Sequence, residues 1–133
     1  MKIIVLVGTY RSITERQIKF LKERLPYLKT TYGENVEIFE FKLDKQSYYI
    51  NDSFMSSLSE YDLMIMSGGE TSDFILRKAD FSYLYNLPGP FPLISYAIIY
   101  GGILEGKRII LKGGLIGNDA IYLSIVEWIH NHG

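Results

Sequence analysis

The stretch LMIMSGGETSD (residues 63–73) decides the fold. Its apolar run stops at two glycines, and an acidic, hydroxyl-rich segment then opens a predicted helix. A short, fully apolar run is typical of a strand buried on both faces of a parallel sheet. Glycines after such a strand let a ligand approach the backbone, and the first N–H groups of the helix favour an anion. The alternative is an ordinary strand-to-helix turn capped by Thr71 or Ser72.

Length and composition predict one globular domain over residues 1–133, with 47% hydrophobic and 22% charged residues. The net charge of −1 shows no basic excess, which argues against sequence-independent nucleic-acid binding. The absence of cysteine excludes disulfides and thiolate chemistry. The first apolar run is too short for a signal peptide, and no stretch reaches the roughly 18 apolar residues of a membrane helix. These observations favour a cytoplasmic protein that contacts no membrane.

Hydrophobic periodicity predicts alternating strands and helices. A strand over 3–7 precedes a helix over 14–25, with Ser12 or Thr14 as its cap and Pro26 as its stop. The pattern next predicts a strand over 36–41, an aperiodic segment over 42–51, a short helix from 52 or 53 and the strand at 63–67. After this strand the sequence predicts a helix over 71–79, a strand over 81–85 and an irregular proline-rich segment over 87–92. Strands over 93–103 and 107–111 form a predicted hairpin, and Asn118 caps a final helix. This order predicts a three-layer α/β domain with a largely parallel central sheet, a C-terminal hairpin and a helix.

Three glycine- or hydroxyl-rich loops each lie between an apolar strand and a helix, at 8–14, 68–72 and 113–117. The carboxyl ends of parallel strands share one sheet edge, where ligands of open α/β sheets bind. Three converging loops favour a bound phosphate over three unrelated turns. Lys112 opens the third loop and is a candidate fixed positive charge, although a solvent-facing strand-end lysine is the commoner case.

Two further patterns have ordinary explanations. Residues 101–108 nearly spell a P-loop, but Arg108 stands where a hydroxyl is needed and a predicted strand follows. His130 and His132 lack a third ligand, so a frayed helix end is favoured over a metal site. Glu70 and Asp73 are three apart and could share a cation, or serve only the helix dipole.

The loops together resemble the C-terminal nucleotide-binding domain of the four-carbon acid sugar kinase family. The matching segments are Gly8-Thr9 followed by Thr14 and Gln17, GGETS at 68–72, PGP at 88–90, and KGGLIG at 112–117. Their order and rough spacing agree over nearly the whole chain. In the family these correspond to a Gly-Ser turn with Thr and Gln, a Gly-Gly-Glu/Asp-Thr motif, a Pro-Gly-Val-Pro turn and a Lys-Ser-Gly-Asn-Phe-Gly loop.

This resemblance implies an ATP site, with Mg²⁺, in a transferase of carbohydrate metabolism. The nucleotide-binding residues that it implies, with Lys112 as the candidate cation, are Thr9, Gly68, Gly69, Glu70, Thr71, Ser72, Lys112, Gly113, Gly114 and Gly117. The chain departs from the family at Gly113, which replaces Ser, and at Leu115-Ile116, which replace Asn-Phe, so a hydroxyl and an amide are missing from the third loop. Family members also carry an N-terminal domain with a Gly-Asp-Asp motif that binds the sugar acid, and this chain begins where the second domain begins.

The leading hypothesis is an ATP-binding domain that forms the nucleotide half of a sugar-acid kinase, whose substrate domain lies on a separate chain. A flavodoxin-like FMN module is a second hypothesis, with Thr9, Ser12 and Thr14 around the phosphate and Tyr10, Tyr48 or Tyr49 against the ring. A regulatory subunit without catalysis is a third. No catalytic residue is identified in the sequence, and a homo-oligomer is left open.

Overall fold

The computed structural model of the chain describes residues 1–8, 12–114 and 116–132. Its six-stranded sheet has the order β2-β1-β3-β6-β5-β4. The strands are β1 (Lys2–Val7), β2 (Asn35–Glu40), β3 (Leu63–Ser67), β4 (Tyr83–Leu87), β5 (Ile94–Tyr100) and β6 (Arg108–Lys112). The helices are α1 (Ser12–Tyr32), α2 (Gln46–Tyr49), α3 (Asp52–Ser57), α4 (Gly69–Lys78) and α5 (Ile121–His132), with short 3₁₀ turns at Leu43–Lys45 and Leu58–Glu60.

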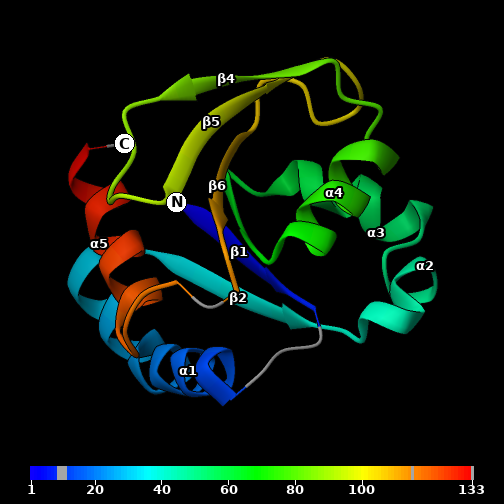
Figure 1. Ribbon diagram of the computed structural model, residues 1–133. Coiled ribbons are helices and arrows are strands. Elements are labelled where there is room, and N and C mark those ends of the chain that lie inside the picture. Colours follow the sequence, from blue (N-terminus) through cyan, green and yellow to red (C-terminus); the bar gives the residue numbers. More distant parts are fainter. Residues whose placement is uncertain (9–11, 115, 133) are drawn as a thin grey trace.

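The sheet is the middle of three layers (Figure 1). Helices α1 and α5 cover one face, and α2, α3 and α4 cover the other. Strands β2, β1, β3 and β6 run parallel, whereas β5 and β4 run antiparallel to their neighbours. The predicted three-layer α/β fold with a largely parallel sheet is therefore confirmed, as is the hairpin between β5 and β6.

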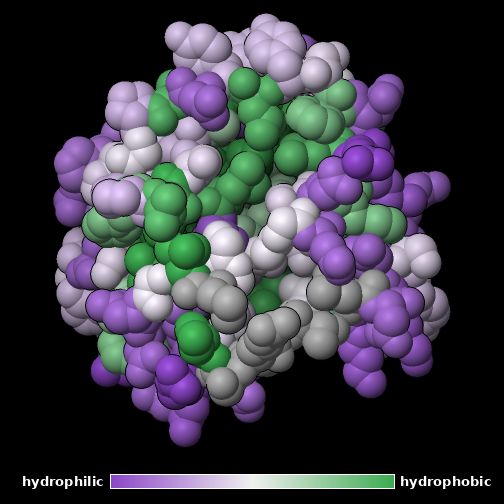
Figure 2. All heavy atoms as spheres, in the orientation of Figure 1, coloured by the Kyte–Doolittle hydropathy of each residue, from purple (hydrophilic) through white to green (hydrophobic). Residues whose placement is uncertain are grey.

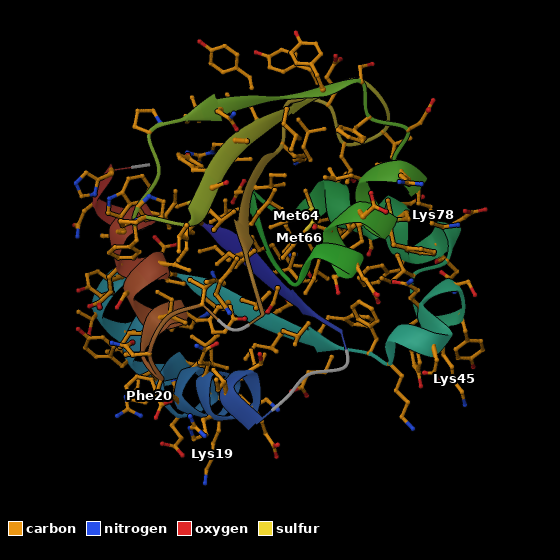
Figure 3. All side chains as sticks on the ribbon, viewed as in Figure 1. Lys19, Phe20, Lys45, Met64, Met66 and Lys78 are labelled. Carbon is orange, nitrogen blue, oxygen red and sulfur yellow. The ribbon has the colours of Figure 1, made fainter. Side chains whose placement is uncertain are left out.

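The apolar runs of β1 and β3 are buried because they lie at the centre of the sheet, with a helix layer on each side. Alternate residues serve the two layers: Val5 and Ile65 belong to the core beneath α1 and α5, whereas Met64 and Met66 face α4 (Figure 3). A fully apolar strand is the pattern that two-sided burial requires.

The prediction that Pro26 ends the first helix is wrong, because α1 continues through Pro26 to Tyr32. The helix ends instead at Gly33, which has a φ of 71°. The Gly33 N–H donates to the carbonyl of Lys29 at 2.9 Å, and the Glu34 N–H donates to that of Leu28 at 3.2 Å. The bond from Gly33 to Lys29 at a positive φ is that of an αL motif, and the two bonds satisfy carbonyls of the last turns, which makes glycine the effective stop.

Other boundaries also differ from the prediction. The segment at 42–51, expected to be aperiodic, contains a 3₁₀ turn and α2, and β4 begins and ends two residues later than predicted. Helix α4 starts at Gly69 rather than at residue 71. The Oδ1 of Asn118 accepts a hydrogen bond from the Ala120 N–H at 3.1 Å, in the turn ahead of α5, so Asn118 lies two residues before the N-cap position instead of capping the helix.

The P-loop-like segment is a tight turn between β5 and β6. At Gly102, which has a φ of 78°, a Cβ atom would lie 1.9 Å from the carbonyl oxygen of Ala79. The glycines are thus explained by close backbone approach, and a strand follows them as predicted. No helix in the described ranges is both long and apolar enough to cross a membrane.

Candidate functional site

The carboxyl ends of three parallel strands lie side by side. In the sheet register Val7 of β1 is opposite Ser67 of β3, and Ser67 is opposite Lys112 of β6. The chain then leaves β1 for α1 on one face of the sheet and leaves β3 for α4 on the other (Figure 1). Helices that depart to opposite faces open a crevice between neighbouring strands, the usual ligand position in open α/β sheets. The segments after the three strands therefore begin at one edge, as the sequence predicts.

The central Gly68-Gly69 turn is held by the backbone. Gly68 has a φ of 93°, in the region that favours glycine, and is the N-cap residue of α4. Its N–H donates to the carbonyl of Lys112 at 2.9 Å, so the turn is joined to the end of β6. The N-terminus of α4, with its partial positive charge, consequently lies at the edge where the strands end.

The side chains after this turn have different surroundings. Thr71 is buried, and the Ser72 hydroxyl donates to the carbonyls of Gly68 and Gly69 within the first turn of α4. Glu70 is exposed. Asp73 forms an ion pair at 3.0 Å with Arg77, one turn further along α4. Its carboxylate is therefore engaged within the helix rather than with a cation shared with Glu70.

Lys112 has a buried side chain, and its exposed fraction is 2%. The solvent-facing alternative is therefore wrong. The ammonium donates to the carbonyl of Gly113 at 2.7 Å and to that of Ile116 at 3.2 Å, and lies 3.5 Å from that of Gly114. It also lies 5.2 Å from the ring centroid of Tyr122 in α5. Burial lowers the pKa of Lys112 to about 8, so the group is still largely protonated at neutral pH.

Two buried side chains of α1 hold the same loop from the other side. The Thr14 hydroxyl donates to the carbonyl of Gly114 at 2.6 Å. The Gln17 amide nitrogen donates to three successive carbonyls, those of residues 116, 117 and 118, at 3.1, 3.0 and 3.1 Å. Thr14 therefore lies inside the first turn of α1 and is not its cap, and the side chain of Ser12 lies outside the described residues.

Together these three donors form what we call the loop clamp: Thr14, Gln17 and Lys112. They engage five carbonyl groups of the third loop, those of residues 113, 114, 116, 117 and 118. Beneath the clamp, Tyr122 is fully buried, and burial raises the pKa of its hydroxyl while Ser67 partly offsets the shift. The sequence suggested Thr14 as a helix cap or a phosphate ligand and Gln17 only through the family resemblance. It gave no sign of Tyr122, whose neighbours are apolar.

The glycines of the edge fall into two classes. A Cβ atom built on Gly69 or Gly114 meets no described atom within 4 Å, so these positions face open space. On Gly117, which has a φ of 92°, a Cβ atom would lie 2.6 Å from Ile121. Gly117 is therefore required by the fold, whereas the fold leaves open space beside Gly69 and Gly114.

Two open grooves flank this edge. One has a volume of about 500 Å³ and runs along α4, lined by Gln46, Glu70, Asp73, Phe74, Arg77 and Lys78. The other, of about 490 Å³, is lined by Ile13, Arg16, Phe20, Gly117, Asn118, Asp119 and Ala120. Figure 2 shows the mixed character of this face, with apolar side chains along the middle and polar ones on its flanks. Both grooves combine an aromatic ring with charged groups.

Several predicted residues lie elsewhere or outside the described ranges. Thr9, Tyr10 and Leu115 are outside the described residues. Tyr48 is 75% exposed on α2 and meets Tyr49 edge to face. His130 contacts Glu34 at 2.7 Å, and His132 contacts the carbonyl of Trp128 at 2.9 Å. Within the described ranges, no three histidine or acidic side chains are placed to hold a metal ion.

Comparison with known proteins identifies similar structures but no sequence relatives. No protein-family model matches the chain, and no curated protein matches it by sequence. Over 97% of its length the fold matches a Bordetella bronchiseptica protein with a domain of unknown function, DUF1537, solved with bound citrate as a domain-swapped dimer (TM-score 0.69, 13% identity). Over 98% it matches a Haemophilus influenzae DUF1537 protein (TM-score 0.59, 14% identity). The chain spans 41% and 40% of the lengths of these two proteins. At such identities the likeness is one of fold, and the chain has the fold of about two fifths of a DUF1537 protein.

Proposed function

We propose that this chain binds the phosphates of ATP, with Mg²⁺, at the edge formed by Gly68, Gly69 and the third loop. The observation that carries the proposal is the loop clamp. Because its three donors engage the loop carbonyls from inside, those oxygens present little negative partial charge to an anion at the edge. The same edge holds the N-terminus of α4, which favours an anion.

The residues present fit a polyphosphate. Gly69 and Gly114 leave open space where phosphate oxygens would lie against the backbone. The Lys112 ammonium lies behind the loop and would contribute positive potential without touching the ligand. Glu70, exposed on the first turn of α4, is the described side chain suited to a hydrated Mg²⁺, and bound Mg²⁺ would neutralise phosphate charge.

We further propose that the chain supplies the nucleotide half of a sugar-acid kinase. The motifs of the chain resemble those of the four-carbon acid sugar kinase family, and the chain covers about two fifths of the similar DUF1537 structures. Phosphoryl transfer requires both substrates to be positioned in line. The sugar-acid site and the groups that act on the acceptor hydroxyl would then come from residues outside 1–133, on the same protein or on a partner.

A thermal-shift experiment tests nucleotide binding directly. Mg-ATP, Mg-ADP, GTP, FMN and NAD are compared at millimolar concentration. A ligand at 100 times its Kd stabilises the folded state by about 2.7 kcal/mol, which raises the midpoint by roughly 10 °C for a domain of this size. The proposal predicts a rise with Mg-ATP. No shift with Mg-ATP would refute it, and a shift with FMN alone, with yellow colour on purification, would establish the flavin hypothesis instead.

A further inference from the structure

The ammonium of Lys112 is a buried charge whose hydrogen-bond partners are all neutral. The side chain is 2% exposed, and its acceptors are the carbonyls of Gly113 and Ile116, with that of Gly114 at 3.5 Å. Within the described ranges, no carboxylate forms an ion pair with it. Buried charges in proteins are normally paired, because removal from water costs free energy that neutral carbonyls offset only in part.

The elements packed around this ammonium supply no counter-charge among the residues that the structure describes. Tyr122 of α5 stays neutral, because burial raises the pKa of its hydroxyl. Ser67 and Ile94 lie opposite Lys112 in the sheet register, and Thr14 and Gln17 of α1 donate to the same loop. The charged side chains in the first turns of α1 and α4 and ahead of α5 are exposed to water: Glu15, Arg16, Glu70, Asp73 and Asp119.

The ammonium lies directly behind the edge proposed to hold phosphate. Gly114, whose carbonyl is 3.5 Å from Nζ of Lys112, faces open space on its Cβ side. The backbone carbonyl of Lys112 accepts the Gly68 N–H at 2.9 Å, so this residue joins two segments of the edge. An anion resting against Gly114 would be separated from the ammonium by a single layer of backbone, across which opposite charges attract more strongly than in water.

We infer that a bound polyphosphate and a proton on Lys112 stabilise each other, so that the site binds its anion most tightly in the protonated form and takes up a proton in alkaline solution. The inference rests on the proposed function, since it takes the anion to lie at the edge of Gly68, Gly69 and the third loop. The ligand supplies the counter-charge that the buried ammonium lacks, and Lys112 is a positioning residue that acts through the loop. The coupling is reciprocal: protonation raises the affinity for the anion by the factor by which the anion favours protonation.

The sign and the range of the effect follow from the burial of Lys112. Burial lowers its pKa to about 8 in the protein without ligand, and a nearby anion opposes this shift. An opposite charge in such a position favours the protonated form by about tenfold. The affinity is therefore highest below pH 8 and falls by up to about tenfold as the pH rises toward 10. At about pH 8.5, roughly half a proton is taken up for each anion bound.

Isothermal titration calorimetry of the full chain with Mg-ATP tests the inference at about pH 7, 8.5 and 9.5, which span the titration of Lys112. A terminal phosphate titrates near about pH 6, so the ligand changes little over this range. The wild-type Kd is expected to rise roughly fivefold or more from the lowest to the highest pH, and two buffers of different ionisation enthalpy should reveal proton uptake at the middle one. Lys112→Met should bind more weakly at the lowest pH and with nearly the same Kd throughout. Lys78→Met, the same change at an exposed lysine of α4 that pairs with Asp52 at 3.2 Å, is the matched control and should keep the wild-type profile.

The outcomes separate this inference from the proposed function. Binding of Mg-ATP with one Kd at every pH and without proton uptake would overturn the inference and leave the phosphate site in place. Equal loss of the pH dependence in Lys112→Met and Lys78→Met would also overturn it. Absence of Mg-ATP binding at every pH would refute the phosphate site and the coupling with it.

A measurement on the wild-type protein decides the matter if circular dichroism shows that Lys112→Met does not fold. The protein is labelled with ¹³C at Cε of lysine, and the Lys112 resonance is titrated by NMR with and without Mg-ATP. The titration midpoint should move to higher pH when the ligand is bound. An unchanged midpoint would overturn the inference.

Discussion

The loop clamp predicts that Gln17→Leu destabilises the protein although it replaces a fully buried polar side chain by an apolar one of similar size. The Gln17 amide nitrogen has two protons for three carbonyls at 3.0–3.1 Å, so two good hydrogen bonds are lost. At about 1.5 kcal/mol for each buried carbonyl left without its donor, the loss is about 3 kcal/mol.

A smaller term opposes this loss. Oε1 of Gln17 is buried and has no hydrogen-bond partner among the described residues, so removing it relieves a desolvation penalty of about 1 kcal/mol. The net prediction is a decrease of roughly 2 kcal/mol in the free energy of unfolding. Equilibrium unfolding in urea, followed by circular dichroism, measures this quantity.

The matched control is Gln46→Leu, the same substitution in α2, where Gln46 is only half-buried. The Gln46 Oε1 is also buried without a hydrogen-bond partner among the described residues, so we expect this variant to gain up to about 1 kcal/mol rather than to lose stability. If Gln17→Leu were no more destabilised than Gln46→Leu, the reasoning about the carbonyls of the third loop would be refuted. A second readout is the midpoint shift with Mg-ATP, which should shrink for Gln17→Leu and stay unchanged for Gln46→Leu if the clamp orders the phosphate site.

Three other perturbations follow from the same edge. The pKa of Lys112 is about 8 in the folded protein and has its ordinary value of 10.5 in the unfolded chain. The unfolded chain therefore binds more protons between these pH values, and this residue makes stability rise with pH from about 8 to 10. Urea unfolding across this range should show the wild type gaining about 2–3 kcal/mol relative to Lys112→Met, and parallel profiles would contradict the assignment. Gly69→Leu and Gly114→Leu should keep the unliganded midpoint within a few degrees, because their Cβ positions meet no described atom, and should abolish the Mg-ATP shift. Gly117→Ala, in contrast, should lower the unliganded midpoint measurably, since its Cβ atom would lie 2.6 Å from Ile121 at a positive φ, and an unchanged midpoint would show that α5 can adjust.

Much of the fold could be predicted because it depends on local patterns. The central strands are continuous apolar runs, and the hairpin between β5 and β6 has a clear turn signal. The end of α1 was mispredicted because proline was given more weight than glycine. Gly33 ends the helix in an αL motif, with its N–H bonded to the carbonyl of Lys29. Pro26 lies six residues before the end of α1, and the helix continues through it.

The convergence of three loops could also be predicted, since parallel strands in sequence order place their carboxyl ends together. The burial of Lys112 could not. Its surroundings depend on Tyr122 and on loop carbonyls that also accept hydrogen bonds from other side chains. One of these donors is Thr14, which lies 100 positions before its acceptor, the carbonyl of Gly114. Lysine is rarely buried in general, and no local pattern distinguishes a lysine that donates inward from one that faces solvent.

The clamp also has a consequence for the order of folding. Thr14 and Gln17 lie in the first two turns of the first helix, yet their acceptors are 99 to 101 positions later. Loop closure over such a separation is slow and comes after local helices have formed. A nascent chain that has reached only β6 therefore contains every strand of the sheet but still lacks the acceptors that fix the start of α1. The edge proposed to hold phosphate can therefore form only after residues 114–118 have been synthesised.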